Sequence, residues 1–353
     1  MPEKRTPTRT TKVTLNDVAR LAGVDRSVVS RVVNNDPNLN IRSETRDRVQ
    51  STIDKLGYRP NAAARSLRTA KAYMYALFIP DFTNPVYAEI ITGAERAAVE
   101  LGYGLMTASS EAVRRGQQHY LDLIAQGRVD GLLFAGEEPG HELERLRATR
   151  VPWLLVNRRI TASDRYVILD DEKAAALAVG HLLTLGHRRI AHLAGPPEAD
   201  TARRRRTGYT EALAAAGLSS NPGDIVHADY TPTGGAEAMH RLLSHPNPPT
   251  AVFVANLASA VGALHTAHEL GISIPHDLSV VAVHDSALAG HLVPALTTVR
   301  MPLERVGGRA LELLARHGPD EAITEIVTEP VELVVRQSTA PPTTHSGRPP
   351  RIR

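Results

Sequence analysis

A short stretch near the start of the chain carries side chains that could bind a nucleic acid duplex. In residues 26–34 the spacing i, i+1, i+4, i+5 and i+8 would place five polar side chains on one face of a helix. A merely solvated helix face more often carries Glu and Lys in i,i+4 pairs. Cations, hydroxyls and an amide without any carboxylate instead suit phosphate oxygens and base edges in a major groove. The five residues are Arg26, Ser27, Ser30, Arg31 and Asn34.

Three short helices are predicted to hold this face in place. The first begins at Thr14, whose hydroxyl can form a capping box with Asp17, and the second is capped by Asp25. The third begins near Ser43 and carries its apolar residues at helical spacing. Helices this short are not stable alone, so we expect them to pack as a helix-turn-helix domain over residues 12–58.

The charge distribution agrees with a polyanionic partner for the N-terminal part. Residues 1–70 hold 14 basic and 7 acidic residues, a formal charge of +7, and the remainder holds 27 and 31, a charge of −4. A basic segment on an acidic body suggests that this segment meets a polyanion, with a solvated basic tail as the alternative. We expect residues 1–11 to form a disordered basic tail.

The segment that follows, residues 59–70, is a candidate switch. Its Pro60 and its alanines favour a helix of about two turns. Because isolated helices shorter than ~12–15 residues are marginal in water, the segment should become ordered only when a partner stabilises it. A plain linker is the alternative interpretation.

Several blocks of the chain resemble, in the right order, members of the LacI/GalR family of transcription regulators. The resemblance implies a sequence-specific DNA-binding repressor that binds a pseudo-palindromic operator as a homodimer. It also implies control by a small-molecule effector, which would be a sugar, a sugar derivative or another metabolite. The matching blocks are residues 13–24, 29–34, 56–61, 64–67, 84–85, 128–131, 186–190, 250–253 and 294–298.

The same resemblance assigns roles to residues of the DNA-binding part. Arg26, Ser27 and Arg31 would read base edges. Residues 59–70 would form hinge helices that pair in the minor groove, where Leu67 would wedge between base pairs and kink the duplex. The rest of the predicted DNA-binding set is Thr14, Asn34 and Tyr58, which would contact phosphates, with Ser30, Asn61, Ala64 and Arg68.

In the body of the chain, apolar strands alternate with amphipathic segments, which predicts parallel sheets covered by helices. The fold class is therefore an all-α helix-turn-helix headpiece plus an α/β core of two doubly wound lobes, similar to type I periplasmic binding proteins. We place lobe 1 at about 71–170 and 299–328, lobe 2 at about 171–298 and 329–338, and a disordered tail at 339–353. The predicted strands are residues 73–79, 104–108, 131–135, 153–156, 190–194, 224–228, 251–255 and 279–283.

Ligands of such folds bind at the carboxyl ends of the strands, here between the lobes. The resemblance implies that Arg205 faces the effector, where its guanidinium could grip a carboxylate, a phosphate or vicinal hydroxyls. His284 and Leu257 stand where many family members have aspartates. Fewer carboxylates and more arginine favour an anionic or aromatic ligand over a neutral sugar. The predicted effector-binding set is Tyr87, Arg158, Arg205, Tyr230, Asn256, His284 and Asp285.

Two other classes of protein find less support in the sequence. A solute-binding protein should begin with a signal peptide, but residues 1–12 are polar and basic. An enzyme would need a nucleophile or a metal constellation, and the chain has neither a Gly-x-Ser-x-Gly motif nor a dense histidine cluster. We therefore expect no enzymatic activity, no cofactor and no metal.

Three further expectations concern the whole chain. It has no cysteine, which excludes disulfides, and no apolar run approaches the ~20 residues that cross a bilayer. We therefore expect a cytoplasmic protein without membrane contact.

No C-terminal leucine heptad is present, so we expect a dimer and not a tetramer. Of the arginine run 203–206, Arg205 is expected at the effector, and its neighbours at the surface or between the lobes.

Overall fold

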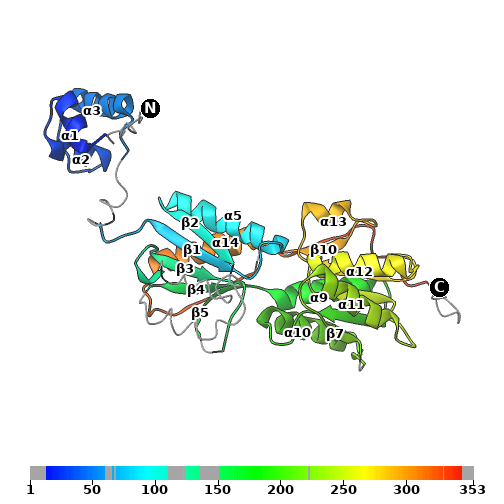
Figure 1. Ribbon diagram of the computed structural model, residues 1–353. Coiled ribbons are helices and arrows are strands. Elements are labelled where there is room, and N and C mark those ends of the chain that lie inside the picture. The colour runs from blue at the N-terminus through cyan, green and yellow to red at the C-terminus, as the bar shows by residue number, and fades with distance from the viewer. Residues whose placement is uncertain are drawn as a thin grey trace, which may run out of the picture. The chain divides into compact units, whose positions relative to one another are not determined.

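The computed structural model shows two compact units, which divide between Lys71 and Ala72 (Figure 1). Residues 1–11, predicted to be a disordered tail, lie outside the described part of the chain. The described residues are 13–59, 66, 69–109, 122, 124–135, 151–161, 163–221, 223–328 and 330–343.

The N-terminal unit, here called the headpiece, begins with the predicted capping box, in which Thr14 and Asp17 each bond the other's backbone N–H. Gly23 ends the first helix with a φ of 65°, a left-handed conformation that glycine adopts without strain. Asp25 caps the second helix by accepting from the Ser27 N–H at 2.8 Å. These positions confirm the predicted helix boundaries. The helices of the headpiece are α1 (Leu15–Ala22), α2 (Arg26–Val33) and α3 (Ser43–Leu56).

Valines from all three helices form the centre of the headpiece. Val18, Val29 and Val49 are fully buried, and Val32 is nearly so. Burying one such side chain contributes ~1.5–3 kcal/mol, which short helices need because none is stable alone. As the spacing predicts, α2 therefore has one buried side and one side turned to solvent.

The second unit contains two six-stranded sheets, one in each lobe. The lobe 1 sheet has the order β11-β5-β4-β3-β1-β2 and is parallel throughout. The lobe 2 sheet has the order β12-β10-β9-β8-β6-β7 and is parallel except for β12. The strands are β1 (Met74–Ile79), β2 (Gly104–Ser109), β3 (Gly131–Phe134), β4 (Trp153–Val156), β5 (Arg165–Leu169), β6 (Ile190–Ala194), β7 (Ile225–His227), β8 (Ala251–Val254), β9 (Ser279–Val283), β10 (Thr297–Arg300), β11 (Ile323–Val327) and β12 (Glu332–Val334).

Helices pack against these sheets in pairs: α5 with α14 in lobe 1, and α9 with α10 and α11 with α12 in lobe 2 (Figure 1). The first pair approaches closely at Gly93, where a Cβ would lie 1.8 Å from the Glu304 carbonyl oxygen. Only glycine allows that approach. The helices are α5 (Pro85–Glu100), α9 (Asp171–Thr184), α10 (Asp200–Ala215), α11 (Pro232–Leu243), α12 (Leu257–Glu269), α13 (Ala287–His291) and α14 (Leu303–Arg316).

The chain passes from one sheet to the other after β5, after β10 and after β11. Each lobe is therefore built from separate stretches of sequence, and the predicted fold class of two α/β lobes behind a helical headpiece is confirmed. All eight predicted strands are present within a residue or so of their expected ends.

One expectation about the C-terminal end is wrong. We placed residues 339–353 in a disordered tail, but the first of them are bound to lobe 2. The His181 Nε2 and Thr339 Oγ1 atoms lie 2.9 Å apart, and the Ala340 N–H donates to Ser279 Oγ at 3.0 Å. These backbone and side-chain bonds hold a stretch that contributes little apolar surface. Residues 344–353 lie outside the described residues.

Candidate DNA-binding face and effector site

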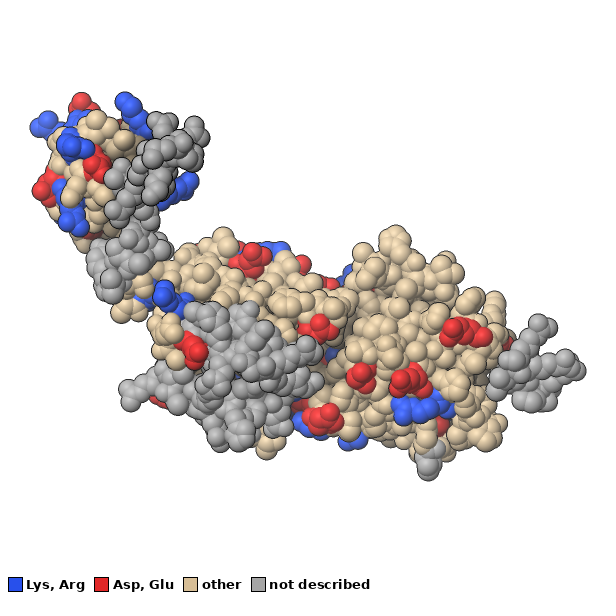
Figure 2. Space-filling model, viewed as in Figure 1, with Lys and Arg blue, Asp and Glu red and all other residues tan. Residues whose placement is uncertain are grey.

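The predicted DNA-binding side of α2 lies on the surface of the headpiece. Arg26, Ser27 and Arg31 are exposed, as is the C-cap residue Asn34, and Ser30 is partly buried. Basic side chains protrude on several sides of the headpiece (Figure 2). This side of α2 is therefore available to a partner of the headpiece.

Arg31 is tied to the loop that follows α2. Its Nε donates to the Asp36 carboxylate at 2.8 Å, and its Nη2 donates to the Asn38 carbonyl at 2.9 Å. The side chain of Arg31 is 45% exposed. A pair this exposed contributes only ~0–1 kcal/mol. The guanidinium can therefore leave Asp36 for another acceptor at small cost.

The predicted phosphate contacts occupy different surroundings. Thr14 is exposed, and its hydroxyl donates to Asp17 at 2.6 Å. The Tyr58 ring lies in the headpiece core, where burial raises the pKa of the phenol and the nearby Arg26 partly offsets that rise. Nothing in these positions tests the phosphate contacts, which stay predictions. Four more predicted contacts lie outside the described residues, namely Asn61, Ala64, Leu67 and Arg68.

The first residues of the core are anchored by Asp130, a residue that the sequence did not single out. Its carboxylate accepts from the backbone N–H groups of Ala72 at 2.9 Å, Tyr73 at 2.6 Å and Met74 at 3.3 Å. Asp130 immediately precedes β3, so it ties the segment that leads from the headpiece to the lobe 1 sheet. In the sequence, Asp130 is a single aspartate before a buried strand. Residue spacing does not show that it binds backbone groups almost sixty positions earlier in the chain.

Arg205 lies on α10 and is the centre of the predicted effector set. Its side chain is 3% exposed, and its guanidinium contacts three groups. The Nε donates to Asp171 at 2.7 Å, the Nη1 donates to the Ala255 carbonyl at 2.6 Å, and the Nη2 lies 2.8 Å from His284 Nε2. Arg205 and His284, predicted from separate parts of the sequence, are therefore in direct contact at the carboxyl ends of β8 and β9.

The contact with Arg205 fixes the protonation of His284. Arginine can only donate, so the Nε2 of His284 must accept and the ring proton must lie on Nδ1. Burial lowers the pKa of His284 well below its usual value, and the charge of Arg205 lowers it further. The Nδ1–H is buried and has no hydrogen-bond partner among the described residues. The backbone of His284 has a φ of 73°, a strained conformation of the kind that clusters at functional sites.

Asn256 and Tyr230 lie together but are used by the fold. The Asn256 Oδ1 caps α12 by accepting from the Ser259 N–H at 3.0 Å, and its Nδ2 donates to the Tyr230 carbonyl at 3.3 Å. The Tyr230 hydroxyl lies 2.8 Å from Thr201 Oγ1. Burial raises the pKa of Tyr230, so this phenol is neutral. Ligand contacts by these two side chains stay predictions.

Asp285 is engaged by the end of the lobe 2 sheet. Its Oδ1 accepts from Thr298 Oγ1 at 2.7 Å and pairs with Arg336 at 2.7 Å, and its Oδ2 accepts from the Nη2 of Arg300 at 2.7 Å. Burial raises the pKa of Asp285, but these hydrogen bonds outweigh it and lower the pKa below its usual value. The carboxylate is therefore ionised and its acceptor sites are occupied, which favours a structural role over the predicted ligand contact.

The lobe 1 members of the predicted set, Tyr87 and Arg158, are both partly buried. Tyr87 packs against the apolar core near the start of α5, and Arg158 follows β4. Beside Arg158 lies Asn157, which the sequence analysis did not select. It is 6% exposed, has a φ of 62°, and its Oδ1 has no hydrogen-bond partner in the described part of the chain. Asn157 therefore resembles His284: each follows a strand directly and holds a buried polar atom in strained backbone.

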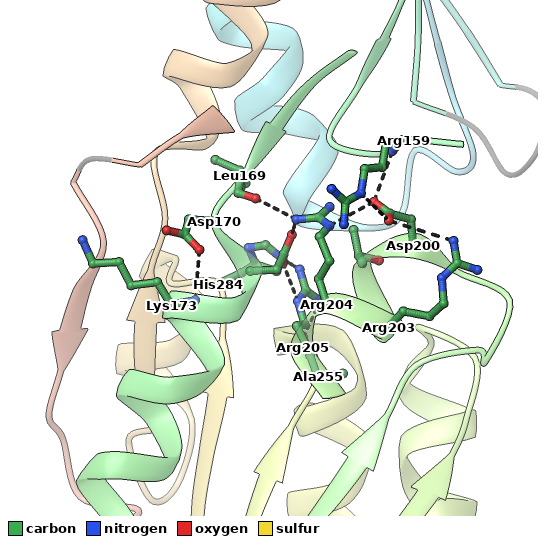
Figure 3. A network of polar contacts seen from close by, with 12 residues as sticks. Arg159, Leu169, Asp170, Lys173, Asp200, Arg203, Arg204, Arg205, Ala255 and His284 are labelled. Carbon is green, nitrogen blue, oxygen red and sulfur yellow. Dashed lines mark hydrogen bonds and ion pairs between the residues drawn. The ribbon is translucent and has the colours of Figure 1, made fainter. Parts of the chain in front are cut away.

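Arg204 is buried beside Arg205, and both are balanced by aspartates (Figure 3). Arg204 pairs with Asp171 and donates its Nε to Asp200 at 2.9 Å. Burial lowers the pKa of Arg204, but the two aspartates outweigh it and raise the pKa, so the group is charged. Asp171 and Asp200 therefore neutralise part of the positive charge of the arginines on α10. The arginines that favoured an anionic ligand are therefore partly paired with aspartates, which the interpretation from the sequence left out.

Within its described ranges, the chain has neither a cluster of metal-binding side chains nor a membrane-spanning helix. No group of three or more His, Asp or Glu side chains in the described ranges could hold a metal ion. Within the same ranges, no helix is both long and apolar enough to cross a bilayer.

Known sequence families match both units. The description "Bacterial regulatory proteins, lacI family" applies to residues 14–61, which include α1, α2 and α3. The description "Periplasmic binding protein-like domain" applies to residues 179–339, which include most of lobe 2. Both matches agree with the resemblance seen in the sequence.

Individual relatives extend over nearly the whole chain. Catabolite control protein A of Priestia megaterium is 36% identical over 93% of this chain and 99% of its own length. The ribose operon repressor of Escherichia coli K12 is 36% identical over 85% of this chain and 92% of its own length. A lac repressor dimer, solved with operator and an anti-inducer, is 28% identical, covers 94% of this chain and 100% of its own, and has a TM-score of 0.79. The chain thus belongs to the LacI family of bacterial transcriptional regulators.

Proposed function

We propose that this LacI-family regulator represses transcription by binding a pseudo-palindromic operator as a dimer, and that a small molecule bound between its lobes controls the binding. The observation that carries the proposal is the exposed side of α2, a helix whose own residues include no carboxylate, in a folded three-helix headpiece. A dimer places two such helices in successive major grooves. The names and complexes of the relatives support the same interpretation.

Within the headpiece, Arg26, Ser27 and Arg31 would read base edges. For Arg31 this requires exchanging its bond to Asp36 for a base, and arginine donates well to a guanine O6 and N7 pair. Residues 59–70 would form the hinge helix, with Leu67 inserted in the minor groove. Ordering of this segment on DNA would supply the stabilisation that a two-turn helix lacks alone.

The effector would contact Arg205 and His284 at the carboxyl ends of the lobe 2 strands. Because the Nδ1–H of His284 is a buried donor, the ligand atom facing it must be a hydrogen-bond acceptor. Asn157 would be the corresponding contact in lobe 1, through its unpartnered Oδ1. Because Asp171 and Asp200 pair with the neighbouring arginines, a neutral hydroxyl, ether or carbonyl oxygen could accept from this donor, as could an anion. The ligand acts through its different affinity for the two lobe arrangements.

A regulator of this kind needs no catalytic group, and we propose that the protein is not an enzyme. Two buried histidines outside the predicted effector set, His187 and His192, hydrogen-bond within lobe 2, which supports this view. A cytoplasmic location follows from operator binding.

Genome-wide footprinting of the full-length protein tests the proposal. We expect a small number of sites with two-fold related half-sites upstream of genes, and occupancy of those sites that changes with a metabolite of the neighbouring pathway. If the purified protein ignores all DNA at low salt, with and without extracts of small metabolites, the proposed function is wrong.

A further inference from the structure

A contact between the lobes, outside the predicted effector positions, joins Arg159 and Asp200. Arg159 follows β4 in lobe 1, and Asp200 is the first residue of α10 in lobe 2. The Asp200 carboxylate accepts from the Arg159 backbone N–H at 3.1 Å and from its Nε at 3.3 Å. Figure 3 shows the Arg159 side chain meeting Asp200 beside the arginines of α10.

Asp200 is held firmly from the lobe 2 side. Arg204, one turn further along α10, donates its Nε to the Asp200 carboxylate at 2.9 Å. The Asp200 side chain is 4% exposed, whereas that of Arg159 is 42% exposed. If the lobes separate, the carboxylate keeps a charged partner and a half-exposed guanidinium regains water. The contact can therefore open without leaving a buried charge unpaired.

Arg204 also connects this contact to the predicted effector positions. Its Nη1 donates to the Leu169 carbonyl at 2.7 Å, at the end of β5, and pairs with Asp171 at the start of α9. The other oxygen of Asp171 accepts from Arg205 at 2.7 Å, and Arg205 contacts His284. One chain of polar contacts thus runs from the lobe 1 surface to His284.

We infer that the Arg159–Asp200 contact is a latch that stabilises the lobe orientation seen here and opens when the lobes rotate. The inference rests on the proposed function in one respect, namely that lobe orientation controls operator binding. A ligand shifts that orientation only by the free energy with which it prefers one arrangement. The latch adds to the free energy that a ligand must supply to rotate the lobes. It lies next to the residues that would hold the ligand.

Arg203 offers a matched control. Its Nη2 lies 3.9 Å from Asp200, and its side chain is 47% exposed, close to the value for Arg159. Arg203 and Asp200 both belong to α10, so their contact does not join the lobes. Removing either cation takes one positive charge from the same carboxylate, but only the loss of the Arg159 side chain removes an ion pair between the lobes.

The experiment measures the distance between the lobes in the full-length protein, without DNA or ligand. Because the chain has no cysteine, Glu95→Cys on α5 and Glu211→Cys on α10 can each carry one spin label at an exposed position. Dilution with unlabelled chains removes signals between subunits. Double electron–electron resonance then compares the parent with Arg159→Gln, with Arg203→Gln, and with Asp200→Asn as a second break of the latch.

We expect both Arg159→Gln and Asp200→Asn to broaden the distance distribution and displace its centre. About 1 M salt should displace the parent in the same direction, because the pair is partly exposed to screening. Arg203→Gln should match the parent at low and at high salt. An unchanged distribution in Arg159→Gln, or equal changes in Arg159→Gln and Arg203→Gln, would overturn the latch. Displaced lobes with unaltered operator binding would instead refute control by lobe orientation, so the two failures are distinguishable.

Discussion

Arg31 offers the sharpest test of how the headpiece reads DNA. In the protein alone its guanidinium bonds Asp36 and the Asn38 carbonyl on a half-exposed side chain. That arrangement contributes ~0–1 kcal/mol, and a bidentate contact with a base contributes ~1–3 kcal/mol. The net gain in binding free energy on the correct base is the difference between these two contributions. We therefore expect Arg31→Ala to weaken operator binding by ~1–2 kcal/mol, which is about 5- to 30-fold.

The neighbouring Asp36 provides the opposite perturbation. Asp36→Asn keeps an oxygen that can accept from the Asn38 N–H but removes the charge that holds Arg31. We expect operator binding to tighten by up to ~1 kcal/mol, because Arg31 no longer leaves an ionic partner and a negative charge near phosphate is lost.

Fluorescence anisotropy with the footprinted operator, and with duplexes changed at one half-site position, measures both effects at fixed salt. Arg31→Ala should also reduce the preference for the base that Arg31 contacts. Equal losses on operator and random DNA would show that Arg31 contacts only the backbone. Weaker operator binding by Asp36→Asn would show that the bond to Asp36 positions Arg31 for DNA, contrary to the reasoning above.

Three further predictions concern the hinge and the core. Leu67→Ala should weaken binding to specific sites and leave salt-dependent binding to random DNA intact, which competition titrations can show. Asp171→Asn should lower the free energy of unfolding by ~3–5 kcal/mol in urea titrations, because it removes the charge between two buried arginines. Burial lowers the pKa of His192 to about 3, so the unfolded chain binds the proton first as pH falls below ~6.5, and stability is lost from there down towards pH 3. At pH 5 the share of His192 should be ~2 kcal/mol, in addition to that of His284, whose pKa burial also lowers, and His192→Gln, which can keep the bond to the Phe253 carbonyl, should remove the His192 share.

Sequence pattern predicts most of the fold because local signals agree with packing. Caps at Thr14 and Asp25 and runs of buried apolar residues define helices and strands directly. Four strands were missed as elements, and their sequences explain why. β11 alternates buried and exposed residues at a sheet edge, β12 is three residues long, and β5 and β10 begin or end with an arginine. Each of these strands depends on pairing with a neighbour that is distant in the chain.

The site residues also divide into those that the sequence predicts and those that depend on packing between distant segments. The resemblance assigned Arg205 and His284 to one site, and the two side chains are in contact in the structure. The partners of those residues could not be predicted, because Asp171 and Asp200 become neighbours only when α9 and α10 pack. For that reason the arginines of the site were predicted without the aspartates that pair with them. Asn157 was missed because a strained backbone and an unpartnered atom leave no mark on residue spacing.

Hydrogen exchange of the full-length protein, with and without its footprinted operator, tests the central claim most directly. On operator DNA we predict strong protection of the backbone N–H groups in α2 and in residues 59–70, and weaker protection of the same groups on random DNA of equal length. Protection confined to the lobes, or an α2 that exchanges equally in the presence and absence of operator, would contradict the assignment of α2 as the recognition helix.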